Sequence, residues 1–121
     1  MGLARKLYHL TAIPRPSGTL AALAGERVAG MANWRLYRLC QRSGDWQEAR
    51  DVLEQMLNRR QMQGSACTAL AKLYEHRFKD YGRALEYARR SARYPDGEPP
   101  ELLEKRVARL RDKLSQRQTQ R

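Results

Sequence analysis

Histidine, cysteine and carboxylate side chains build most catalytic and metal sites, and this sequence holds few of them in a usable pattern. The two histidines, His9 and His76, have no cysteine or carboxylate at ligand spacing except Glu75, and adjacent residues on a helix point apart. The glycines occur singly, so no phosphate-binding loop is indicated. We therefore expect no catalytic residue, no metal site and no cofactor, and we do not expect an enzyme.

The two cysteines, Cys40 and Cys67, fall at helix positions that should face the core. They are expected to be small buried hydrophobes rather than parts of a disulfide scaffold. No signal-peptide core and no stretch long enough to span a membrane is seen. These features favour the cytoplasm and give no indication of a membrane partner.

Positive charge is the strongest chemical feature, because 24 Lys and Arg against 13 Asp and Glu give a net charge of +11. Such an excess favours an acidic peptide or protein, or a nucleic acid, as partner, although it also keeps a basic protein soluble. Near the C-terminus Arg106, Arg109, Lys113 and Arg117 step by three or four and form one helical stripe. This stripe would suit a phosphate backbone, or equally the solvated side of a terminal helix.

Helices must position these side chains, because good helix formers dominate and no alternating run of strand length occurs. The predicted fold class is all-α. A short helix is expected at 1–13, as the possible remnant of a preceding domain, and a linker with two prolines at 14–25. Further helices are predicted over residues 26–42, 46–58 and 65–77, after Asp80, and over 101–115.

Apolar spacing predicts which helix faces are buried. The helix over 26–42 should bury one broad face, formed by Val28, Met31, Ala32, Leu36, Leu39 and Cys40. The last helix should bury Leu102, Leu103, Val107, Leu110 and Leu114. Helix N-caps are predicted at Asp45, Ser65 and Asp80, and a left-handed residue at Gly44.

Two of the predicted helix pairs are copies of each other. The motif Gly44-Asp45-Trp46-x-x-Ala49 recurs as Lys79-Asp80-Tyr81-x-x-Ala84, 35 residues later, whereas Leu36 and Cys40 align with Leu70 and Tyr74 after 34 residues. The difference predicts one extra residue in the second turn, around residues 76–79. A period of 34 with a small residue in the second helix resembles the tetratricopeptide repeat (TPR).

This resemblance implies two TPR-like α-hairpin repeats within residues 26–121, closed by a capping helix at 101–115. The first helix of each TPR pair lines the concave face of the stack. The residues that the resemblance places in this groove are Trp34, Arg38, Arg42, Lys72, Glu75 and His76. Arg38 and Lys72 occupy equivalent positions, so together they would clamp a carboxylate or phosphate beside Trp34, unless the face is merely solvated.

A more specific resemblance involves the run Ala-Leu-Ala-Lys-Leu-Tyr-Glu-His-Arg-Phe-Lys-Asp-Tyr over residues 69–81, which continues to Tyr87, and the closing helix over 101–114. Both are similar to the helical C-terminal region of bacterial YprB-type proteins, in which a ribonuclease H-like 3′–5′ exonuclease domain precedes it. The resemblance implies nucleic-acid metabolism and a nuclease domain as a partner. Such nucleases gather carboxylates around two metal ions, and no such set occurs here, so the activity does not carry over.

Three hypotheses follow. The first is a non-catalytic helical-repeat module that binds an acidic peptide or a nucleic acid. The second is an accessory domain that holds substrate for a ribonuclease H-like exonuclease. The third is a purely structural domain.

Overall fold

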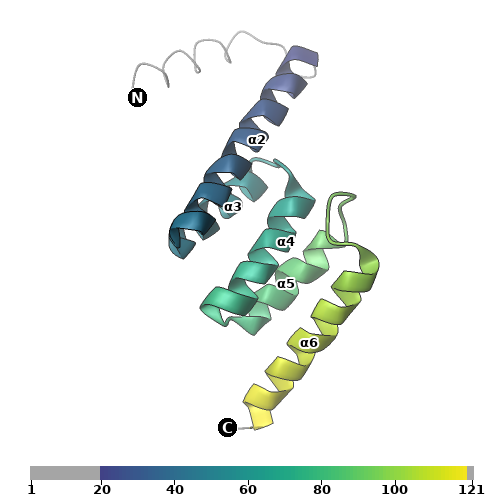
Figure 1. Cartoon of the computed structure of the whole chain (residues 1–121). Coiled ribbons are helices and arrows are strands. Elements are labelled where there is room, and N and C mark those ends of the chain that lie inside the picture. The colour runs from purple at the N-terminus through teal and green to yellow at the C-terminus, as the bar shows by residue number, and fades with distance from the viewer. Residues whose placement is uncertain (1–19, 120–121) are drawn as a thin grey trace.

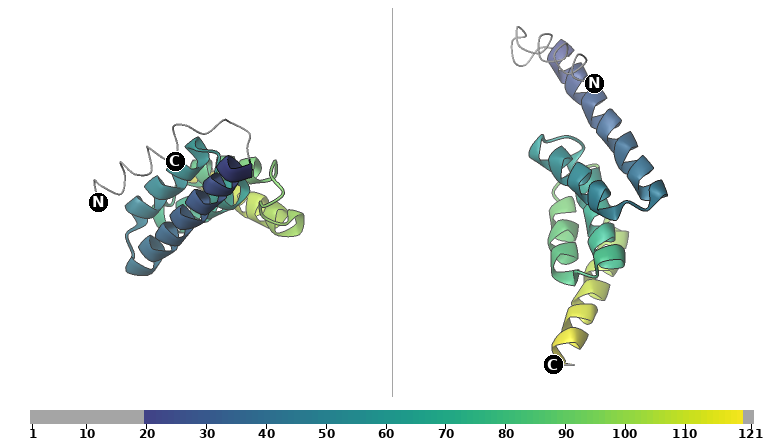
Figure 2. Two further views of the ribbon diagram at one scale, coloured as in Figure 1. Left: turned by 90° about the horizontal axis from the view of Figure 1, so that it is seen from above. Right: turned by 90° about the vertical axis from the view of Figure 1, so that its left-hand side faces the viewer.

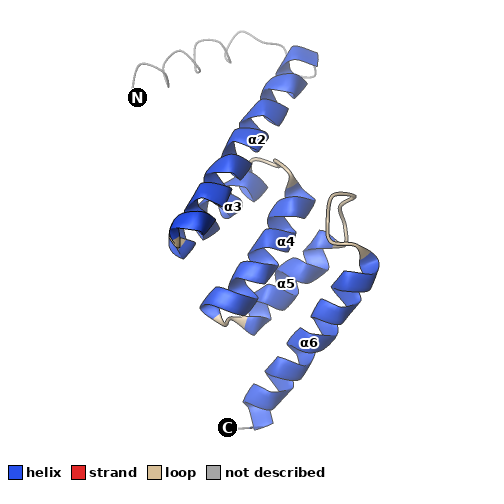
Figure 3. Cartoon of the chain, viewed as in Figure 1, coloured by secondary structure: helices blue, strands red, loops and turns tan. Residues whose placement is uncertain are grey.

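The computed structural model describes the backbone of residues 20–119 and the side chains of residues 25–118. This part of the chain is helical and contains no strand (Figure 3), which confirms the all-α prediction. The short helix expected at 1–13 and the prolines of the expected linker lie outside the described residues. The elements are α2 (Leu20–Ser43), α3 (Trp46–Asn58), α4 (Gln63–Leu73), the π-helical turn η1 (Tyr74–Phe78), α5 (Tyr81–Ser91) and α6 (Pro100–Thr119).

The helices form a stack of two α-hairpins followed by a single helix. Helix α2 pairs with α3 and α4 with α5, and α2, α4 and α6 lie in front of α3 and α5 in Figure 1. The right-hand view in Figure 2 shows the same two layers from the side. Each helix packs mainly on its neighbours in chain order. This nearest-neighbour arrangement is that of a short solenoid, and the predicted TPR-like fold is therefore confirmed.

The turns inside the two hairpins are built alike. The carboxylates of Asp45 and Asp80 accept hydrogen bonds from the backbone N–H three residues later, each at 3.2 Å. Both predicted N-caps are thus confirmed. The residue before each cap is left-handed, with φ of 78° at Gly44 and 55° at Lys79.

The predicted extra residue of the second turn is confirmed by the backbone hydrogen bonds. The N–H of Asp45 donates to the carbonyl of Cys40, five positions earlier, at 3.0 Å. The N–H of Asp80 instead donates to the carbonyl of Tyr74, six positions earlier, at 2.9 Å. The additional residue is absorbed by η1, because a π-helical turn holds one residue more than an α-helical turn.

The core lies between the layers. Ala49 and Ala84, the equivalent small residues of the two hairpins, are fully buried, which allows the paired helices to approach closely. Leu53, Met56, Leu70 and Leu110 are among the largest fully buried side chains. Cys40 and Cys67 are also buried and form no disulfide, as expected.

The start of α4 differs from the prediction. Ser65 does not cap this helix, which begins at Gln63. The cap comes from Asp96, whose carboxylate accepts from the backbone N–H groups of Gly64 at 3.1 Å and Ser65 at 3.0 Å. Gly64 is fitted to this contact, since a Cβ there would collide with Asp96 and with the backbone of Gly97. The loop before α6 is thereby fastened to the start of α4.

Helix α2 corrects two predictions. It begins at Leu20 and runs through Gly25, so the segment 20–25 is helix and not linker. Its predicted core face is also wrong, because Val28, Met31, Leu36 and Leu39 are 67%, 55%, 43% and 59% exposed and Ala32 is exposed as well. Of that face only Cys40 is buried as predicted, and Gly30 and Tyr37, which were not predicted, are buried with it.

Helix α6 is longer than predicted, because it extends from Pro100 to Thr119. Of its five predicted core residues, Leu110 is fully buried and Leu103, Val107 and Leu114 are half-buried. Leu102 is 52% exposed, so its assignment to the core was wrong.

Candidate functional site

The most unusual side chain of the described region is a fully buried carboxylate. Glu75 lies in η1, has no solvent-exposed surface and is surrounded by cations from α6. Arg106 Nη1 donates to its Oε1 at 2.8 Å, Arg109 Nε to its Oε2 at 2.6 Å and Lys113 Nζ to its Oε2 at 3.0 Å. We call this group of four residues the Glu75 cluster.

The spacing of the three cations explains how α6 completes the cluster. Arg106, Arg109 and Lys113 step by three and four and so share one face of the helix. Leu110 is fully buried beside them, which shows that this face packs inward. Arg106 also donates two hydrogen bonds to Glu98 of the preceding loop, from Nε at 2.9 Å and from Nη2 at 3.1 Å. Two carboxylates and a buried arginine thus hold α6 against the second hairpin.

The charges in the cluster govern the pKa of Glu75. Burial alone would raise the pKa of this carboxyl group. Hydrogen bonds from Arg109 and Lys113, together with the positive charge of Arg109, outweigh burial and lower the pKa to about 2. Glu75 is therefore ionised at neutral pH and is neutralised by its partners.

The predicted phosphate-contacting stripe lies largely within this cluster. Arg106 is only 8% exposed, and Arg109 and Lys113 are ion-paired with Glu75. The fourth member, Arg117, lies over the ring of Tyr81 at 4.9 Å. A phosphate would have to displace Glu75 or Glu98 to reach Arg106. Phosphate binding by the stripe stays a prediction, and this arrangement counts against it.

The predicted groove residues come from α2, α4 and η1, in the front layer of Figure 1. Arg38, Arg42 and Lys72 are exposed and make no ion pair with any described residue. Trp34 is half-buried rather than exposed, and its ring lies 4.9 Å from that of Tyr37. Helices α2 and α4 thus carry these three exposed cations, and Trp34 is partly covered. We call Trp34, Arg38, Arg42 and Lys72 together the front face. A role in binding stays a prediction for all of these residues.

His76, the last of the predicted groove residues, is mainly uncharged at neutral pH. Burial lowers its pKa below the usual value of 6.5, and the charges of Arg106 and Lys113 add to this effect although Glu75 opposes it. Sequence reasoning also expected Glu75 and His76 to point apart. The π-helical turn instead brings His76 Nε2 within 3.7 Å of Glu75 Oε1. Residues 25–118 contain no group of His, Cys, Asp and Glu suited to hold a metal ion.

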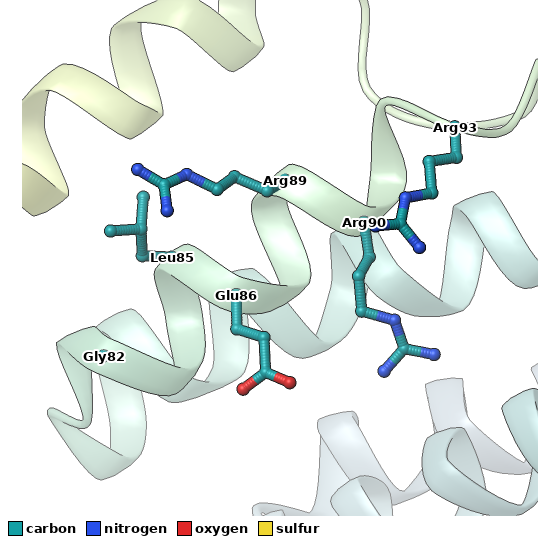
Figure 4. Close-up of a pocket in the computed structure, with 6 residues that line it drawn as sticks. All are labelled: Gly82, Leu85, Glu86, Arg89, Arg90 and Arg93. Carbon is teal, nitrogen blue, oxygen red and sulfur yellow. The ribbon is translucent and has the colours of Figure 1, made fainter.

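A shallow hollow on α5 was not anticipated from the sequence. Figure 4 shows its lining residues, which are Gly82, Leu85, Glu86, Arg89, Arg90 and Arg93. Arg89 and Arg93 are exposed, whereas Arg90 lies over the ring of Tyr87 at 5.2 Å. The signal available in the sequence was the closely spaced arginines of this helix, opposed by Glu86 alone. The hollow is a second cationic surface, formed on α5, and Figure 1 shows that this helix lies behind α4.

Six of the thirteen acidic residues, by contrast, cap helices or form hydrogen bonds or ion pairs with other elements of the fold. Asp45, Asp80 and Asp96 cap helices, and Glu75 and Glu98 bind arginines of α6. Glu54 accepts a hydrogen bond from the hydroxyl of Tyr74 at 3.0 Å. All four arginines of α2, and Arg83 and Arg89 of α5, are exposed and present positive charge to solvent.

Comparison with known families agrees with this architecture. A family model of the tetratricopeptide repeat matches residues 35–62, which run from α2 through α3. The chain contains a TPR-like repeat. Searches of curated proteins and of solved structures found no match. TPR repeats are typical of protein-interaction modules, and the match therefore suggests a protein-interaction module. The likeness of residues 69–87 and 101–114 to a nuclease-associated tail stays a prediction.

Within residues 20–119, no helix is sufficiently long and apolar to cross a membrane.

Proposed function

We propose that this TPR-like chain is a non-catalytic interaction module whose front face binds an acidic peptide of a partner protein. The observation that carries the proposal is the pair Arg38 and Lys72. They occupy equivalent positions of the two repeats, 34 residues apart, and both are exposed and free of ion pairs. Arg42, one turn after Arg38, adds a third cation. A peptide that lies across α2 and α4 would meet these charges in sequence.

An acidic peptide fits the charge distribution better than a nucleic acid does. Three of the four cations in the stripe that would follow a phosphate backbone are already ion-paired with Glu75 or Glu98. The front face combines three cations that pair with no described residue with the half-buried aromatic ring of Trp34. Such a mixture of apolar and cationic groups favours a peptide with both acidic and apolar side chains.

The test is binding of a fluorescein-labelled peptide of alternating Glu and Leu, about 12 residues long, measured by anisotropy at low and at physiological salt. We expect micromolar affinity that falls at least about tenfold in the double variant Arg38→Glu, Lys72→Glu. The matched control is Lys105→Glu, Arg111→Glu, which changes the net charge equally at two exposed α6 residues without ion pairs. Equal losses in the two double variants would show that only net charge matters and would refute the site.

The same assay with single-stranded RNA and DNA addresses the competing functions. Nucleic acid bound more tightly than the peptide, with a steep salt dependence, would favour a substrate-holding domain beside a nuclease and would overturn the peptide proposal. Absence of binding to peptide and nucleic acid alike would leave a purely structural domain.

A further inference from the structure

The outer side of α2 carries four of the five large apolar residues that are exposed in the described region. Val28, Met31, Leu36 and Leu39 are between 43% and 67% exposed, and Ala32 lies among them. Together with Arg35 they form one side of the helix, which we call the α2 edge face. A contiguous apolar surface of this kind on a folded protein marks a site of interaction.

The internal repeat identifies what this face is equivalent to. Shifted by 34 residues, Ala32, Leu36 and Leu39 become Ala66, Leu70 and Leu73 of α4, all of which are 5% exposed or less. Helix α4 is covered by α5 on one side and by α3 on the other, whereas α3 is the one described helix that packs extensively on α2. Helix α3 is the second helix of the hairpin that begins with α2, just as α5 is the second helix of the hairpin that begins with α4. The α2 edge face is therefore the counterpart of the surface through which α4 contacts α3, and no helix of the described region packs extensively on it.

The side chains that a helix covering the α2 edge face would need can be inferred from α3 and from the arginines of α2. Helix α3 has an apolar stripe flanked by three carboxylates, at Glu48, Asp51 and Glu54, and contains a single cation, Arg50. On the α2 edge face, Arg35 replaces the small Ala69 of the second repeat, so a cation stands inside the apolar surface. Helix α2 holds four arginines and one glutamate. The α2 edge face thus combines exposed apolar side chains with the positive charge of Arg35.

We propose that the α2 edge face docks an amphipathic helix of a partner protein, with an apolar stripe on Ala32, Leu36 and Leu39 and an acidic residue opposite Arg35. The helix would occupy the position relative to α2 that α3 occupies relative to α4. This site is distinct from the front face. Arg38 and its equivalent Lys72 are both exposed, whereas Leu36 and Leu39 are exposed and their equivalents Leu70 and Leu73 are buried.

Charge decides among the possible occupants. A second copy of the chain would bring the arginines of its own α2 against those already present, and like charges at close range oppose association. Residues 1–19 contain three Lys and Arg and no Asp or Glu, so they offer no partner for Arg35. An acidic helix from another polypeptide satisfies both the apolar and the cationic part of the face.

The test uses a hydrocarbon-stapled, labelled peptide with the sequence of residues 45–59, because this segment contains the helix that covers the equivalent face of α4. Anisotropy with the full chain should show saturable binding. Binding should weaken at least about tenfold for Leu39→Ser and for a peptide in which Glu48, Asp51 and Glu54 are changed to Lys. Leu102→Ser is the matched control, since Leu102 is 52% exposed on α6 against 59% for Leu39 on α2. Arg35→Glu should weaken binding, and Arg111→Glu should not.

Several results would overturn the proposal. One is absence of saturable binding, and another is an equal loss in Leu39→Ser and Leu102→Ser. Sedimentation equilibrium would reveal a second copy on this face as a dimer that Leu39→Ser dissociates. Replacement of Leu3, Leu7 and Leu10 by Ser in the full chain would reveal residues 1–19 as the occupant if it strengthened peptide binding. The front-face variant Arg38→Glu, Lys72→Glu separates the two proposals, because the stapled peptide should keep a larger share of its affinity there than in Leu39→Ser.

Discussion

Arg106 donates a 2.8 Å hydrogen bond to Glu75 although the two residues are 31 positions apart and both are buried. This contact joins α6 to the π-helical turn of the second hairpin. The same turn absorbs the extra residue that distinguishes the second repeat from the first. The irregularity in the repeat is thus the place where the last helix is attached.

Replacement of Glu75 by Gln should destabilise the fold strongly. The change leaves Arg106 buried with one carboxylate partner instead of two, and it removes the ionic partner of Arg109 and Lys113. We expect a loss of about 3 kcal/mol in the free energy of unfolding, because removal of one member of a buried ion pair leaves uncompensated charge. Urea denaturation followed by circular dichroism measures this change in the free energy of unfolding. Glu101→Gln, an exposed change on α6, is the control and should have little effect.

Stability should fall in acid through the same residue. The pKa of Glu75 is lowered from 4.5 to about 2 in the folded state. The unfolded chain therefore takes up a proton first, so the stabilisation is complete above pH 4.5 and is lost as the pH falls from about 4.5 to 2. Urea midpoints measured across this range should decline less steeply in Glu75→Gln than in the natural chain. Parallel curves for the two proteins would contradict the assignment.

Local sequence signals predicted the hairpins well. The caps at Asp45 and Asp80, the close contacts at Ala49 and Ala84, and the extra residue of the second turn all depend on residues near one another in the chain. Such features are encoded by spacing and residue type alone.

Three of the errors share a different cause, because each depends on a distant element. The burial of Glu75 requires α6, and the cap of α4 comes from Asp96, 32 residues after Gly64. The apolar spacing of α2 was interpreted as a core face, whereas the helix that would cover Leu36 and Leu39 is absent from the described structure. Periodicity shows that a face is apolar but does not show which neighbour covers it.

The contact between Gly64 and Asp96 gives a prediction with an internal control. A Cβ at Gly64 would collide with the Asp96 side chain and the Gly97 backbone, so Gly64→Ala should cost about 2 kcal/mol through strain and loss of the cap. A Cβ at Gly25 of α2 has no neighbour within 4 Å. Gly25→Ala should therefore stabilise the helix by up to about 1 kcal/mol. Thermal melting of the two variants should shift in opposite directions, and a shift in the same direction would refute the contact.

The equivalent turn residues Gly44 and Lys79 provide a reciprocal test of backbone strain. Both are left-handed, with φ of 78° and 55°, and this conformation is unfavourable for any residue with a Cβ. Lys79→Gly should therefore stabilise the chain by about 0.5 kcal/mol, since the relief of strain exceeds the added freedom of the unfolded chain. Gly44→Ala should destabilise it by about 1 kcal/mol, and no steric contact contributes because a Cβ there has nothing within 4 Å. Urea denaturation of both variants measures these changes. A destabilising effect of Lys79→Gly would mean that the lysine side chain contributes more to the turn than its left-handed backbone costs.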